Sequence, residues 1–117
     1  MNANDYQKLA ARTLIDEPGF EISPEQIMIA WCSIGLAGEA GEIAELVKKG
    51  IFHQHGIDVE KIKKELGDVL WYVAALCTQF NLEMSEIMQQ NIHKLKVRYP
   101  NGFSSIESKR RADMPPS

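Results

Sequence analysis

The chain has 117 residues, of which 44% are hydrophobic and 25% are charged, and its formal net charge at pH 7 is −3. These values indicate one soluble domain with a single modest core. They argue against a nucleic-acid polymer as partner, because such binders present a basic face, and against a membrane span, because the longest unbroken apolar run covers only residues 69–77.

The first half of the sequence predicts two helices. Asn4 or Asp5 is placed to cap a short helix over about residues 5 to 15. Ser23, followed directly by Pro24 and three residues later by Gln26, is a strong helix start. The helix that follows is expected to run from Pro24 to about Lys49.

Four glycines bear on this second helix. Gly50 is expected to end it as a left-handed C-cap. Gly35, Gly38 and Gly41 lie inside it, where each costs up to about 1 kcal/mol relative to alanine. Glycines at such positions indicate close approach of a neighbouring helix or a ligand, or a local bend.

The second half predicts two further helices. Asp58 is placed to cap a helix from Val59 to about Phe80, apolar on most of its circumference and therefore expected to be deeply buried. The next helix is expected to begin near Glu83 or Ser85 and to end at Arg98. The sequence lacks a strand pattern, so the predicted fold class is all-α, a compact bundle of four main helices.

Assembly and location follow from the same pattern. The apolar circumference of the third helix exceeds what four short helices can cover, which predicts a homodimer or tetramer. Cys32 and Cys77 both fall mid-helix among apolar residues and are expected to be buried thiols of a reduced compartment, which with the polar first residues indicates the cytoplasm. We expect one domain over residues 1–103 and a loosely ordered or partner-contacting tail over 104–117.

Two acidic pairs are the most informative chemical feature. Glu39 and Glu42, like Glu65 and Asp68, are three residues apart, so each pair shares one helix face beside an apolar stripe. One such pair is usually a solvated face, whereas four carboxylates converging beside a core need a cation between them. Oxygen ligands predict a Mg²⁺ site, with Mn²⁺ as its substitute. Glu45 points about 120° away from Glu39 and would act outside the ligand set or on a second ion.

The fourth predicted helix carries a complementary stripe. Asn91, Lys94 and Arg98 recur at three- and four-residue spacing and share one face. This face suits a phosphate chain, and a solvated basic face is an equal alternative. Tyr72, one turn beyond the second acidic pair, is a core aromatic that is also placed to stack on a base. His53 and His55 are not favoured as a metal pair, because no other potential ligand accompanies them at the spacing of a metal site. Carboxylates with cations and no evident nucleophile indicate metal-assisted hydrolysis of a polyphosphate.

Three blocks in this order resemble a known family. They are G-E-x-x-E at 38–42, K-E-L-G-D-V-L-W-Y at 64–72 and N-x-x-K-x-x-x-R-Y-P at 91–100. Together, over about residues 25 to 106, they resemble the MazG-like branch of the all-α nucleoside triphosphate pyrophosphohydrolases. The family pattern is E-E-x-x-E followed by E-E-x-x-D, so Gly38 and Lys64 depart from it. The remaining carboxylates match its Mg²⁺ ligands: Glu39, Glu42, Glu65 and Asp68.

The resemblance implies hydrolysis of a nucleoside triphosphate, above all a deoxynucleotide, to a monophosphate and pyrophosphate, in cleansing of the nucleotide pool. Glu39 or Glu42 would orient or deprotonate the attacking water. Lys94 and Arg98 would bind phosphates, and Asn91 phosphate or sugar. Related members act on dUTP, dCTP or, as a minor alternative here, phosphoribosyl-ATP. The alternative from another class is a non-catalytic oligomerisation or regulatory module with a structural Mg²⁺.

Overall fold

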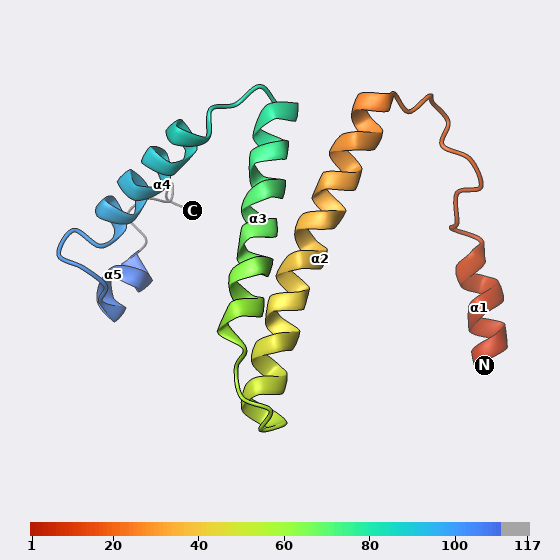
Figure 1. The fold of residues 1–117 in the computed structure, drawn as a ribbon. Helices are drawn as coiled ribbons and strands as arrows, with labels where there is room; N and C mark the ends of the chain where they lie inside the picture. The colour runs from red at the N-terminus through yellow and green to blue at the C-terminus, as the bar shows by residue number, and fades with distance from the viewer. Residues whose placement is uncertain (111–117) are drawn as a thin grey trace.

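The computed structural model describes residues 1–110. It contains five helices in chain order: α1 (Ala3–Ala11), α2 (Pro24–Phe52), α3 (Val59–Gln79), α4 (Met84–Arg98) and α5 (Ser105–Arg110). Within the described residues the β structure amounts to one isolated bridge between Pro100 and Gly102. The predicted all-α class is therefore confirmed (Figure 1). Helix α5 lies in the predicted tail, and the last seven residues of that tail are outside the described part of the chain.

The helix starts follow local capping. As predicted, the Ser23 hydroxyl accepts a hydrogen bond from the Gln26 amide at 3.1 Å, and the Gln26 side chain accepts one from the Ser23 amide at 2.9 Å. Asp58 caps α3 by accepting from the Lys61 amide at 3.1 Å. The predicted cap of α1 is wrong. Asn2 is the N-cap, and Asp5, three residues later, completes a capping box with it.

The predicted end of α2 at Gly50 is also wrong. The helix continues to Phe52, with His53 as its C-cap. Gly50 serves packing instead, because a β-carbon there would lie 2.6 Å from Ile57 Cγ1. The left-handed conformation occurs a little further on, at Gln54 (φ 56°) and Gly56 (φ 78°), where the chain turns towards α3.

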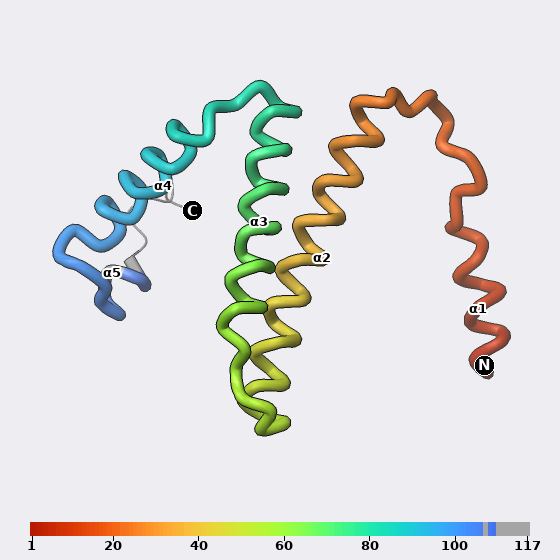
Figure 2. Tube along the Cα trace, viewed as in Figure 1, coloured from red at the N-terminus to blue at the C-terminus, as the bar shows by residue number. Residues whose placement is uncertain are grey.

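Helices α2 and α3 form an antiparallel hairpin, which is the centre of the structure (Figures 1 and 2). Gly35 packs against Tyr72 in its upper half, and Gly50 packs against Ile57 at the connecting turn. In the described chain, the only other pair of helices with more than marginal contact is α4 with α5. Helices α1 and α4 diverge from the hairpin on opposite sides (Figure 2).

One chain therefore does not form the predicted compact bundle. Its radius of gyration is 20.6 Å, whereas a compact domain of this length has about 13 Å. Residues classed as buried among those described are Cys32 and Cys77, with 3% and 7% exposure. Both are free thiols, as predicted. The expected deep burial of α3 is wrong for a single chain, because α2 alone packs along it and Trp71 remains 62% exposed.

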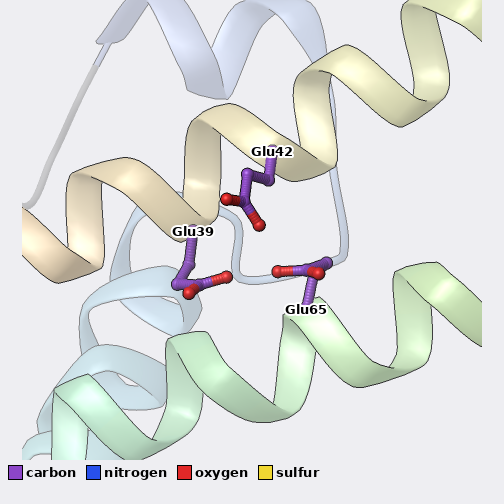
Figure 3. A group of neighbouring side chains, drawn as sticks. All are labelled: Glu39, Glu42 and Glu65. Carbon is purple, nitrogen blue, oxygen red and sulfur yellow. The ribbon is translucent and has the colours of Figure 1, made fainter.

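Helix α2 is also long and apolar enough to cross a membrane by length and composition, with a mean hydropathy of 1.3 over its most apolar window. The length of the longest unbroken apolar run does not reveal this property of α2, because small and neutral residues interrupt its apolar residues. A core helix of a water-soluble protein meets the same criteria. The helix also carries Glu39 and Glu42 in its interior turns, and both side chains point towards α3 (Figure 3).

Candidate metal centre

Three glutamates converge between the two helices of the hairpin. Glu39 and Glu42 project from successive turns of α2, and Glu65 projects towards them from α3 (Figure 3). One carboxylate oxygen from each residue lies within 4.8 Å of the others. The predicted meeting of the two acidic motifs is thus present for these three side chains, which we call the glutamate cluster.

The burial of the glutamate cluster leaves polar atoms without partners. Glu39 and Glu65 are half-buried, whereas Glu42 is exposed. The Oε2 atoms of Glu39 and Glu65 are shielded from solvent and have no hydrogen-bond partner among the described residues. Buried carboxylate oxygens without a donor are unfavourable, and a hard divalent cation supplies the charge that they lack. The donor set and its spacing therefore fit an oxygen-coordinated metal ion.

The electrostatics of the cluster agree with this reading. The pKa of Glu42 is raised, first through the carboxyl group of Glu65 and also by partial desolvation and the charge of Asp68. The pKa of Glu65 is raised, first through the carboxyl group of Glu39, with desolvation and the charges of Glu39 and Asp68 adding to it. Every side chain that raises these values is a carboxyl group, so the metal-free cluster favours holding a proton.

Asp68 and Glu45 flank the cluster in different ways. The negative charge of Asp68 acts on Glu42 and Glu65, but its oxygens fall outside the three-residue group. Its role as a fourth ligand stays a prediction. Glu45 is held by Lys48 at 3.3 Å and Lys49 at 3.6 Å, and chiefly Lys48 lowers its pKa. Glu45 is therefore already paired on its own helix.

An aromatic hollow lies beyond the cluster towards the open end of the hairpin. It has a volume of about 310 Å³, and its lining is Met28, Trp31, Cys32, Trp71 and Tyr72. The rings of Trp71 and Tyr72 meet edge to face, with centroids 5.1 Å apart. Tyr72 is half-buried there, and its predicted stacking on a base remains a prediction with a suitable cavity beside it.

The polar stripe of the fourth helix is not brought to the cluster in one chain. Asn91, Lys94 and Arg98 all lie on α4, which packs on α5 and not along the hairpin. The side chains that shift the pKa values of Glu42 and Glu65 are carboxyl groups of α2 and α3, not cations of α4. The predicted phosphate contacts of these three residues are thus untested by the geometry of a single copy.

Comparison with known proteins identifies the family. A model of the MazG nucleotide pyrophosphohydrolase domain matches residues 32–103 of the chain. The chain belongs to the MazG family. A relative with the name Gene 37 protein, from Mycobacterium phage L5, is 37% identical over 106 residues, which cover 87% of this chain and 92% of the relative. No solved structure matches the chain.

The MazG match confirms the resemblance inferred from the three motifs, and all of the residues proposed for the site lie inside it. One cation near the glutamate cluster escaped the sequence reasoning. Lys61 lies one turn before Glu65 on α3 and lines a hollow of about 230 Å³ that Glu42 and Glu65 also line. The spacing of four residues from Glu65 was the available signal.

Proposed function

We propose that this MazG-family protein is a Mg²⁺-dependent pyrophosphohydrolase that converts a nucleoside triphosphate, above all a deoxynucleotide, to a monophosphate and pyrophosphate. The observation that carries the proposal is the convergence of Glu39, Glu42 and Glu65 within 4.8 Å, with two buried oxygens that have no hydrogen-bond donor. Family membership supports the reaction class, and removal of unwanted triphosphates is the role that fits it.

We assign metal binding and activation of water to different residues of the glutamate cluster and its surroundings. Glu39, Glu42 and Glu65 would hold the ion, with Asp68 beside them, and Mn²⁺ suits the same donors. When bound, the cation supplies positive charge against the phosphate oxygens and acidifies a water molecule. Glu42 is the exposed member of the cluster, so it and Glu39 are our candidates to orient the attacking water or accept its proton.

The competing proposal is a non-catalytic oligomerisation or regulatory module in which the ion is structural. A structural site is normally closed by protein ligands, whereas a catalytic one keeps a position open for water or substrate. Glu42 is exposed and borders a hollow of about 230 Å³. This open side of the cluster favours the enzyme.

The deciding experiment is an assay of all common NTPs and dNTPs with Mg²⁺ that resolves monophosphate, diphosphate, pyrophosphate and phosphate. Monophosphate with pyrophosphate, lost on addition of EDTA, is the expected result and also ranks the bases. Diphosphate with phosphate would show cleavage of the other anhydride bond. No turnover with Mg²⁺ still bound would favour the structural module.

We further propose that the protein acts as a homodimer or tetramer in the cytoplasm. The accessible surface of one chain is 10128 Å², whereas a compact monomer of 13.2 kDa exposes roughly 6,400 Å². Obligate dimers commonly bury about 2,000–5,000 Å² in total, and each chain contributes half of that area. The excess surface of this one chain is larger than such a contribution. Large apolar side chains stand exposed on α3 and α4, among them Leu70 at 56% and Ile92 at 52%. A second copy of the chain is the partner that would cover these faces, and such burial also accounts for the apolar character of α2 without a membrane.

A further inference from the structure

The hairpin arranges three chemically different features along its length. Nearest its open end lies the aromatic hollow with Trp71 and Tyr72. The glutamate cluster follows, and beyond it, towards the connecting turn, lies the hollow that Lys61 lines. On α3, Tyr72 is about 10 Å and Lys61 about 6 Å along the helix axis from Glu65, in opposite directions. A molecule with an aromatic end and a chain of anionic groups matches this order.

The lining of the second hollow separates Lys61 from an ordinary surface lysine. The hollow is bounded by Glu42, Glu45, Leu46, Lys61 and Glu65. Glu45 is already paired with Lys48 and Lys49, so its charge does not require Lys61. Within residues 1–110, Lys61 makes no ion pair shorter than 4.0 Å. Its ammonium group is the only cation among the lining side chains.

The position of Lys61 suits phosphate rather than metal. An ammonium group repels a divalent cation but binds phosphate oxygens as a point charge. Because Lys61 lies on the same helix face as Glu65, one turn away, an anion next to the glutamate cluster can reach both an ion held by the cluster and this lysine. The three polar residues of α4 are not packed against the hairpin, so Lys61 is the cation that a single copy places in the hollow.

We propose that Lys61 binds the phosphate chain of the substrate and the departing pyrophosphate in the hollow beside the glutamate cluster. The proposal rests on the proposed function for the identity of the ligand. It assigns to this chain a phosphate-binding residue on α3, in addition to the predicted ones on α4. The nucleobase of the substrate would then lie in the aromatic hollow on the other side of the cluster.

The test measures binding and not turnover. Inorganic pyrophosphate is titrated by calorimetry into the Mg²⁺-saturated full-length protein, for wild type, Lys61→Gln, Lys61→Arg and the control Lys63→Gln. Lys63 is also exposed on α3 but does not line the hollow. We expect Lys61→Gln to weaken pyrophosphate binding about tenfold or more, Lys61→Arg to retain most of it, and Lys63→Gln to bind like wild type.

Several outcomes would overturn the proposal. Equal pyrophosphate affinity of Lys61→Gln and Lys63→Gln would do so, as would the absence of pyrophosphate binding by the wild type. Loss of Mg²⁺ affinity in Lys61→Gln would also overturn it, because the lysine would then position the carboxylates instead. Far-ultraviolet circular dichroism identifies a variant that fails to fold, in which case Lys61→Ala against Lys63→Ala decides, with the same expected results. Hydrolysis by wild type with unchanged pyrophosphate binding in Lys61→Gln would remove this inference and leave the proposed function intact. Pyrophosphate binding that depends on Lys61, without any hydrolysis by the wild type, would support this inference and contradict the proposed function.

Discussion

The ring of Tyr72 packs directly on the backbone of Gly35, so closely that a β-carbon at position 35 would overlap the ring carbons. This contact joins α2 to α3 at the aromatic hollow and sets the position of the ring that we propose for base stacking. The glycine is therefore required by its neighbour and not by its own backbone conformation. Gly38 and Gly41, in the same helix, face open space within 4 Å.

Gly35→Ala is expected to destabilise the protein by about 1–3 kcal/mol, because Tyr72 or the α2 backbone must shift to admit the methyl group. Gly41→Ala is the matched control and is expected to stabilise by up to about 1 kcal/mol through helix propensity. Denaturant unfolding followed by circular dichroism measures both. Equal effects of the two substitutions would mean that the contact with Tyr72 does not form in solution.

Removal of a cluster carboxylate should separate activity from folding. Glu65→Ala is expected to abolish Mg²⁺-dependent turnover, since it takes away the only member of the cluster from α3. Asp68→Ala should lower turnover by about 10–100-fold, the range for groups that support metal ligands from outside. Glu60→Ala, on the same helix but away from the cluster, is the control. Near-normal activity in Glu65→Ala with a bound metal ion would disprove the carboxylate site.

The raised pKa values of Glu42 and Glu65 predict the pH dependence of the metal-free protein. Between the unfolded value, about 4.3, and the higher folded value, the folded protein holds more protons than the unfolded chain. Its free energy of unfolding therefore falls as the pH rises through that interval, and the loss is complete at higher pH.

Glu65→Gln removes one of the interacting charges, so in EDTA it should unfold at a higher temperature than wild type at neutral pH. The difference should shrink as the pH falls towards about 4.3, where the carboxyl groups become protonated. Thermal scans of both proteins across this range provide the measurement. With saturating Mg²⁺ the order should reverse, because the ion stabilises the state that binds it. A difference that is constant with pH would exclude carboxylate repulsion as its cause.

Ile92→Glu is expected to reduce or abolish self-association, because it places a charge in the exposed apolar face of α4. Light scattering after size exclusion should give wild type a mass that is a multiple of 13.2 kDa. Gln90→Glu, which adds the same charge elsewhere on α4, should retain that mass. A monomeric wild type would contradict the proposed assembly.

Several local features of this fold were predictable, although the cap of α1 was not. The caps at Ser23 and Asp58 and the extent of α3 follow from neighbouring residues, and all three predictions hold. The prediction that α2 ends at Gly50 was wrong, because glycine at this position serves a tertiary contact with Ile57 and not a C-cap. Glycine is equally suited to both uses, so the sequence alone does not separate them.

In the candidate site, too, some residues could be predicted from the sequence and others could not. The periodicity of the two acidic motifs was sufficient to place Glu39, Glu42 and Glu65 on facing helices. It was insufficient for Lys61, because a lysine four residues from a glutamate is common on exposed helix faces and does not by itself indicate a binding site. The stripe on α4 depends on how that helix packs, and nothing within the helix determines its partner.

Within residues 1–110, the two buried residues, Cys32 and Cys77, bear on how the chain reaches its native state. Two thiols enclose too little apolar surface to offset the backbone entropy lost on folding, about 1–2 kcal/mol for each residue. If copies supply the remaining burial to one another, folding and association are a single reaction. Refolding is then expected to be second order, and the unfolding midpoint to rise with protein concentration. At low expression, the dilution of the chain itself would limit how much of it is folded.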